Sequence, residues 1–186
     1  MVKTASSPQV LNTGSKAPDF ALKGVDNIMH SLQDYKSKAT LVIFICNHCP
    51  YVKAVRDRII RDVRELHRHG IGAIGIMSND PADYPEDSFD NMARIAQEYG
   101  YPFPYVWDET QQVAKAYGAV CTPDFFGFND KLELQYRGRL DASRKEAASP
   151  DARRDLFEGM LQVAQTGHGP AEQIPSIGCS IKWRVD

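Results

Sequence analysis

The feature that most constrains the fold is a short apolar run, Leu41 to Ile45, that ends in two closely spaced cysteines. Five bulky apolar residues in succession predict a β-strand buried on both faces. From Tyr51 to His69 the apolar residues recur at helical spacing, and Gly70 stands where a glycine commonly ends a helix. The sequence therefore predicts a strand that delivers the segment Cys46 to Pro50 to the start of a helix.

The rest of the chain predicts an α/β domain. A second apolar run, Ile71 to Met77, follows the helix, so the two runs form a βαβ unit with parallel strands and a right-handed crossover. The later elements that we expect are a helix at 88–99, an edge or loop segment at 101–108 that contains Pro102 and Pro104, a short helix at 111–117, a hairpin that turns at 130–131, and a helix with Ser149 as its N-cap. This order predicts a mixed sheet covered by helices.

Composition limits the classes of protein to consider. The 186 residues are 42% hydrophobic and 25% charged, which is typical of one soluble globular domain. The net charge of −2 gives no electrostatic reason to expect nucleic acid or a membrane surface as partner. No apolar run reaches the roughly 18 residues of a membrane span, and residues 1–13 lack the apolar segment of a secretory signal. We therefore expect a cytoplasmic protein.

Cys46 and Cys49 form a CxxC pair, whereas Cys121 and Cys179 stand alone. In a reducing compartment such a pair is more often catalytic or metal-binding than structural. A cysteine must be a thiolate to attack a disulfide or a peroxide, and the start of a helix stabilises that anion. The spacing lets one sulfur attack a partner and the other resolve the mixed disulfide. His48, between them, adds a positive charge that favours the thiolate, and neither an organic cofactor nor a metal ion is needed.

Three other interpretations compete with redox chemistry. A structural disulfide needs an oxidising compartment. A zinc site has enough ligands in the four cysteines and His48, but such sites usually use two close-spaced pairs. A non-catalytic metal-binding module, for copper by ligand softness, would use Cys46, His48 and Cys49. We favour redox chemistry and keep the metal-binding module as the alternative from another class.

A second signal is the dipeptide Thr122-Pro123, which precedes an expected strand. A proline there would disturb the start of strand pairing unless it occupies a tight turn, and a cis peptide bond is the natural solution. A trans proline in an ordinary loop is the alternative that base rates favour for an arbitrary bond of this kind.

Together these segments resemble the thioredoxin-like superfamily, in the redoxin branch that includes peroxiredoxins of the AhpC/TSA type and thiol–disulfide reductases. The resemblance runs from about Gly14 to Phe157, opens with GSKAPDFAL, and includes the strand–CxxC–helix element and the segment VCTPDFF. It implies a thioredoxin-like fold, a central mixed sheet flanked by helices with an insertion helix. The domain would span residues 14–168, between an N-terminal tail at 1–13 and a C-terminal tail at 169–186.

The resemblance also implies roles. Cys46 and Cys49 would be the redox pair, facing a cis-proline loop at Thr122-Pro123 whose backbone pairs with a bound substrate strand. We favour Cys46 as the attacking sulfur, because the first cysteine of a CxxC is normally the more exposed. Cys121 would lie near the site or be an ordinary buried cysteine.

His48 before the second cysteine resembles the C-x-H-C of protein disulfide isomerases. That likeness implies a couple on the order of −200 rather than −270 mV, which rests as the dithiol in the cytosol. The implied partners are a thiol electron donor of the thioredoxin or glutathione type and a disulfide or peroxide substrate. Relatives of this kind often form oligomers, but nothing in the sequence fixes an interface.

The chain departs from the peroxiredoxin pattern Pro-x-x-x-Thr/Ser-x-x-Cys, because Val42 and Cys46 occupy the first two positions. Cys49-Pro50 nevertheless looks like the step that follows the peroxidatic cysteine. The alternative function is therefore a thiol peroxidase with Cys49 peroxidatic and Cys46 or Cys179 resolving. Cys179, in PSIGCSIKW, is either this third redox cysteine or an ordinary tail cysteine.

Overall fold

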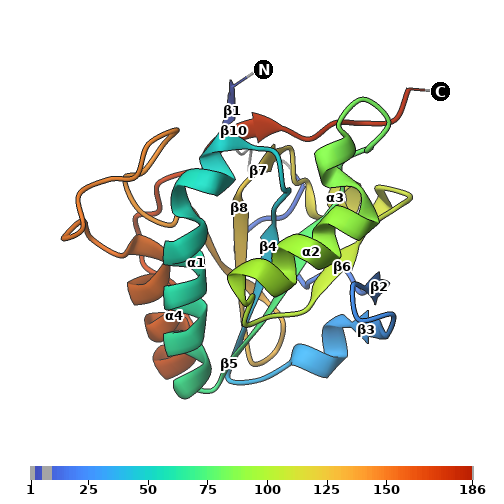
Figure 1. The fold of residues 1–186 in the computed structure, drawn as a ribbon. Coiled ribbons are helices and arrows are strands. Elements are labelled where there is room, and N and C mark those ends of the chain that lie inside the picture. The colour runs from blue at the N-terminus through green and yellow to red at the C-terminus, as the bar shows by residue number, and fades with distance from the viewer. Residues whose placement is uncertain (1–2, 6–9, 186) are drawn as a thin grey trace.

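A seven-stranded mixed sheet forms the centre of the computed structural model, which describes residues 3–5 and 10–185 (Figure 1). Its strands, in spatial order, are β3 (Met29–Ser31), β2 (Ala21–Gly24), β6 (Tyr105–Trp107), β5 (Ile71–Met77), β4 (Ala39–Phe44), β8 (Asp124–Asn129) and β9 (Leu134–Arg137). The helices are α1 (Pro50–Arg68), α2 (Phe89–Tyr99), α3 (Gln112–Tyr117) and α4 (Asp155–Thr166), with single turns of 3-10 helix at η1 (Leu32–Tyr35) and η2 (Pro85–Asp87). This is the predicted α/β architecture.

The strand β4 lies at the middle of the core. It runs parallel to β5 and antiparallel to β8, and all six of its residues are buried. Leu41 and Ile43 belong to the apolar core that also contains residues of α1, α2 and α4, whereas Val42 and Phe44 belong to the core beneath α3 and η1. Because side chains alternate along a strand, a continuous apolar run is what a two-faced core requires.

Helix α1 follows the predicted strand as expected. Its apolar positions pack on the sheet, with Val52, Val55 and Val63 among the buried residues. Cys49 is the N-cap residue and Pro50 the first helical position, where a missing N–H costs no hydrogen bond. The predicted βαβ unit of β4, α1 and β5, with its parallel strands, is confirmed.

A second, three-stranded sheet joins the two ends of the chain. Its strands are β1 (Lys3–Ala5), β10 (Ile177–Ser180) and β7 (Cys121–Thr122), paired antiparallel in that order. It lies at the N-terminal end of α1, at the top of Figure 1. The sequence predicts only tails at both ends, because each short strand depends on partners more distant in the chain than any local pattern reveals.

The prediction that segment 101–108 forms an edge strand or a loop is wrong. β6 is an interior strand that pairs with β5 on one side and β2 on the other. Both prolines precede the paired residues, so neither has to donate a ladder hydrogen bond, and the carbonyl of Pro104 accepts one from Gly75 N at 2.9 Å.

The predicted start of the last helix is also wrong, since α4 begins at Asp155 with Arg154 as its N-cap residue. Arg154 forms ion pairs with Asp62 at 2.6 Å and Glu65 at 3.0 Å, both on α1. Ser149 instead begins a turn in which its carbonyl accepts from Ala152 N. A tertiary ion pair therefore fixes the start of the helix in place of the local capping signal.

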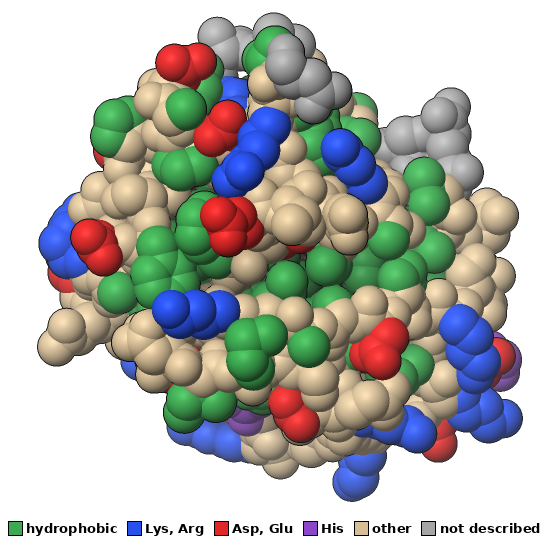
Figure 2. All heavy atoms as spheres, turned by 90° about the vertical axis from the view of Figure 1, so that its right-hand side faces the viewer, with side chains coloured by type: hydrophobic (Ala, Val, Ile, Leu, Met, Phe, Trp, Pro, Cys, Tyr) green, Lys and Arg blue, Asp and Glu red, His purple; other side chains and the backbone are tan. Residues whose placement is uncertain are grey.

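The surface carries charges of both signs. On the face shown in Figure 2, hydrophobic side chains cross the middle, and Lys, Arg, Asp and Glu side chains are interspersed around them. No helix within residues 3–5 and 10–185 combines the length and apolar character needed to cross a bilayer.

Replacement of Ile43 by alanine tests the central role of β4. Ile43 is 0% exposed, and its truncation should lower the free energy of unfolding by about 2–5 kcal/mol in urea titrations. Ile28, which is 59% exposed, provides the control, and Ile28→Ala should change stability by less than about 0.5 kcal/mol. Equal losses in the two variants would contradict the two-faced core.

Candidate functional site

The CxxC segment links β4 to α1 and faces a cis peptide bond. The bond between Thr122 and Pro123 is cis, as the sequence favours for the start of β8. Thr122 Oγ1 lies 3.4 Å from Cys46 Sγ, and Thr122 O lies 3.3 Å from Cys49 Sγ. Thr122 therefore contacts both sulfurs of the pair, one through its side chain and one through its backbone.

The strand β10 brings a third cysteine to the pair. Cys179 lies directly opposite Thr122 in the β10–β7 register, and its Sγ is 2.8 Å from Cys49 Sγ. Cys121 neighbours Thr122 in sequence, but its Sγ lies 4.0 Å from Pro123 O. Burial raises the pKa of Cys121 well above that of an ordinary thiol. Cys121 thus stays protonated beside the site.

The three clustered sulfurs differ in charge. The hydrogen bond between Cys49 and Cys179 holds the pKa of Cys49 below its usual range, with help from Cys46 and from the Val52 N–H against the opposing effect of burial. Burial raises the pKa of Cys46, and the hydrogen bond to Cys49 and the charge of Asp87 raise it further. The pKa of Cys179 rises through its hydrogen bond to Cys49 and through burial. Of these three sulfurs, Cys49 is the one whose pKa is lowered.

The predicted greater exposure of Cys46 is wrong. Cys46 and Cys49 are each 0% exposed. Cys46 follows β4, whereas Cys49 is the N-cap of a 19-residue helix, where the aligned peptide dipoles favour an anion. Exposure therefore gives no reason to prefer Cys46 as the attacking sulfur.

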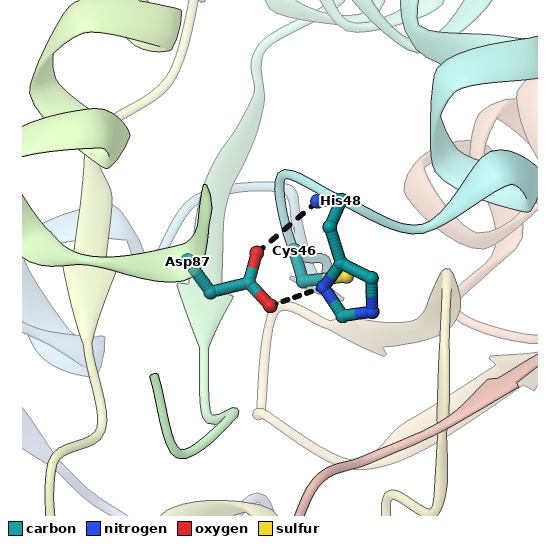
Figure 3. A group of neighbouring side chains, drawn as sticks. All are labelled: Cys46, His48 and Asp87. Carbon is teal, nitrogen blue, oxygen red and sulfur yellow. Dashed lines mark hydrogen bonds and ion pairs between the residues drawn. The ribbon is translucent and has the colours of Figure 1, made fainter. Parts of the chain in front are cut away.

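Asp87 of η2 organises the CxxC loop. One of its carboxylate oxygens accepts hydrogen bonds from the backbone N–H groups of Asn47 at 2.7 Å and His48 at 3.1 Å. The other accepts from His48 Nδ1 at 2.5 Å and from Asn79 Nδ2 at 2.9 Å, and Figure 3 shows the His48 and Asp87 side chains pointing toward each other. Burial raises the pKa of Asp87, but the hydrogen bonds from His48 and Asn79 outweigh it, so the pKa stays below the ordinary value.

This network changes the role expected of His48. The Asp87 carboxylate that His48 contacts would offset a positive charge on the ring, so such a charge would stabilise a thiolate only weakly. The contact instead holds the His48 side chain in place within the CxxC loop. Its ring also stacks on Tyr84 at 4.6 Å between centroids. Asn47 completes the loop, accepting from Tyr105 Oη at 2.9 Å.

The residues of the proposed metal-binding module are only partly brought together as a ligand set. Cys46 and His48 have ligand atoms within 4.8 Å of one another and of Asp87, whereas Cys49 is not a member of that group (Figure 3). Both oxygens of Asp87 already accept two hydrogen bonds each. A metal ion there would have to displace contacts that hold the loop.

Sequence analysis missed Asp87 and Asn79. Both follow β5, and the carboxyl ends of parallel strands meet at one edge of a sheet, so the loop after β5 must lie beside the loop after β4. An acidic residue and an amide in that loop were a usable signal. The predicted βαβ unit already implied where they would lie.

Comparison with known proteins agrees with this geometry. The sequence profile of the AhpC/TSA family matches residues 13–137, and the chain belongs to that family. It is a redoxin-type protein with a thioredoxin-like fold, as the sequence predicts. The thioredoxin domain of a thiol-disulfide oxidoreductase from Bacteroides vulgatus, 19% identical, superposes with a TM-score of 0.58 over 72% of this chain and 90% of that domain.

Two solved structures match nearly the whole chain. A conserved protein from Geobacillus kaustophilus is 45% identical, with a TM-score of 0.92 over 100% of this chain and 98% of that one. A hypothetical protein from Sinorhizobium meliloti 1021 is 35% identical, with a TM-score of 0.90 and 98% of each chain covered. The thiol-disulfide oxidoreductase ResA of Geobacillus thermodenitrificans is 28% identical over 117 residues, which are 61% of this chain and 61% of that protein.

Replacement of Asp87 by asparagine tests the loop network. An amide group cannot accept all four hydrogen bonds, so we expect a loss of about 1–3 kcal/mol in unfolding free energy at pH 7. A lowered folded-state pKa means that Asp87 stabilises the fold above its ordinary pKa of 3.8 and loses this effect as the pH falls through the folded-state value. The difference in unfolding free energy between wild type and Asp87→Asn, measured by urea unfolding, should therefore become smaller in acid.

The exposed Asp57 of α1 supplies a matched control for this substitution. Asp57→Asn should shift stability by less than about 0.5 kcal/mol. If the loss of unfolding free energy in Asp87→Asn stayed constant from pH 7 into acid, the assigned contacts would be contradicted.

Proposed function

We propose that this protein is a thiol–disulfide oxidoreductase that reduces disulfides through a Cys46–Cys49 dithiol/disulfide couple. The observation that carries the proposal is the contact of both sulfurs with Thr122 on the cis-proline loop. The name of the ResA relative, a thiol-disulfide oxidoreductase, supports the same class of reaction. No organic cofactor takes part.

The lowered pKa of Cys49 and its place at the start of α1 support an order of events in which Cys49, rather than Cys46, attacks first. The Cys49 thiolate attacks one sulfur of a substrate disulfide, which breaks the S–S bond and releases the other sulfur as a thiolate. Cys46 then gives up its proton and attacks Cys49 Sγ. This step releases the second substrate thiolate, which takes a proton, and leaves a Cys46–Cys49 disulfide. A thiol donor of the thioredoxin or glutathione type returns the pair to the dithiol.

The resting state of the couple follows from its environment. Hydrogen bonds that stabilise the Cys49 thiolate favour the reduced pair over the disulfide. Such stabilisation makes the couple more oxidising, so a thiol donor in a reducing compartment, for which we propose the cytoplasm, has to keep the pair reduced while it reduces substrate disulfides.

Serine variants of the two cysteines test this function. Disulfide reduction with a dithiol donor should fall to the uncatalysed rate in Cys49→Ser, because a hydroxyl does not supply a nucleophile at neutral pH. In Cys46→Ser a mixed disulfide with the substrate should form but turnover through the pair should be lost. Cys121→Ser, which changes a protonated thiol outside the pair, serves as the control and should retain turnover. Full activity of Cys49→Ser would refute the proposal.

One observation favours a second candidate, a thiol peroxidase. A stabilised Cys49 thiolate with another sulfur at 2.8 Å has the components needed to attack a peroxide and then resolve the sulfenic acid. Peroxide consumption, measured in parallel on the same variants, separates the two. If Cys46→Ser keeps peroxide turnover and Cys49→Ser loses it, the peroxidase becomes the better description.

A further inference from the structure

The strand β10 occupies the backbone edge that borders the redox pair. Cys179 is paired with Thr122 and Ser180 with Cys121, and Ile181 N donates to Val120 O at 3.0 Å. Thr122 is the residue that contacts Cys46 and Cys49, so its backbone is where an extended segment can present a sulfur to Cys49. This chain's own C-terminal strand does so, with Cys179 Sγ at 2.8 Å.

The fit of β10 to this edge depends on a glycine. A Cβ atom at Gly178 would lie 1.9 Å from Thr122 O and 2.6 Å from Thr122 C, both backbone atoms that cannot move aside. The residue that precedes Cys179 therefore lets the strand approach closely enough for the sulfurs to meet. Any larger side chain at this position would hold β10 away from β7.

Contacts after Cys179 hold the strand over the site. Lys182 N donates to Asn79 Oδ1 at 2.9 Å, and Lys182 O accepts from Asp80 N and Gln111 Nε2 at 2.8 Å each. Arg184 N donates to Gln111 Oε1 at 2.9 Å. The same loop after β5 that orders the CxxC segment, through Asn79 and Asp87, thus also fastens β10.

With β10 in place, the sulfurs are closed off. Cys46 and Cys49 are 0% exposed and Cys179 is 1% exposed. A disulfide bond in another protein cannot reach Cys49 Sγ while β10 is in this position. A pocket lined by Tyr51, Pro123, Ile177 and their neighbours opens next to the start of β10.

From this geometry we propose that β10 is an internal exchange partner of the redox pair: Cys179 is a third redox cysteine that resolves disulfides on Cys49, and an external disulfide reaches Cys49 when β10 leaves β7. This inference rests on the proposed function and inserts one step into it: Cys179, before Cys46, releases the second half of the substrate from Cys49. The external substrate is a disulfide carried on an extended segment that takes the place of β10 along Thr122.

The exchange balances in sulfur, electrons and protons. The Cys49 thiolate attacks one sulfur of the external disulfide, which breaks the S–S bond, releases the other half as a thiolate and leaves a mixed disulfide on Cys49. When β10 returns, Cys179 loses its proton and attacks Cys49 Sγ, which forms a Cys49–Cys179 bond and expels the remaining half as a thiolate that takes the proton. Cys46 then attacks Cys49 Sγ in the same manner and frees Cys179, leaving the Cys46–Cys49 disulfide for the thiol donor.

The redox role of Cys179 is tested in a Cys46→Ser/Cys121→Ser double variant. One equivalent of oxidised glutathione is added to the folded, reduced protein, and peptides are mapped after acid quenching. The expected product is a Cys49–Cys179 disulfide with glutathione released. A persistent glutathione adduct on Cys49, with Cys179 still open to alkylation, would overturn the role of Cys179.

Turnover separates this inference from the proposed function. If Cys46 and Cys49 are required for disulfide reduction but the double variant never forms the Cys49–Cys179 bond, the function stands and the inference fails. If Cys49→Ser retains activity, the proposed function itself fails.

The covering role of β10 is tested with a glycine pair. Gly178→Ala should raise the rate of Cys49 alkylation by iodoacetamide, located by peptide mapping, roughly tenfold or more because β10 no longer docks. Gly169→Ala is the matched control, since its Cβ would meet a backbone oxygen, Gln135 O, at 1.8 Å elsewhere in the C-terminal segment. It should leave the alkylation rate within about twofold of wild type. Equal rates in all three proteins would overturn the covering role.

Discussion

The backbone and side chain of Thr122 form the contact on which the redox site depends. Its carbonyl oxygen meets Cys49, its hydroxyl meets Cys46, and its strand edge pairs with β10. The cis bond to Pro123 joins this edge to β8, which pairs with β4 along its full length and so fixes the distance to the loop that β4 carries. A shift of β8 against β4 would separate Thr122 from both cysteines at once.

Burial and charge act in opposition within this cluster. Removing a thiolate from water raises its pKa, yet Cys49 keeps a low one because thiols and the first turn of α1 replace the lost water as hydrogen-bond donors. Cys46 has the opposite balance, since it donates to Cys49 and lies near the charge of Asp87. The surroundings thus shift the pKa values of two cysteines in opposite directions, although only two residues separate them, and sequence spacing alone does not distinguish the two.

The fold was largely predictable because its central elements carry strong local signals. The apolar run of β4, the helical spacing of α1 and the glycines after the helices each reflect a single dominant force, burial or backbone geometry. The CxxC pair and the proline at 123 likewise predicted where the candidate redox site would lie. The predictions failed where tertiary contacts decide, as in the ion pairs of Arg154 and the interior place of β6. Asp87 and the position of Cys179 also depend on segments that meet only after folding.

Strand β1, at the edge of the three-stranded sheet, places the beginning of the chain next to the strand that covers the redox site. Lys3 pairs with Cys179, Thr4 with Gly178 and Ala5 with Ile177, so β1 borders the very strand that covers the sulfurs. The first and last segments of the polypeptide are therefore neighbours beside Cys49. A truncation that removes β1 would therefore take away one of the two strands that pair with β10, although it lies more than forty residues before the redox pair in sequence.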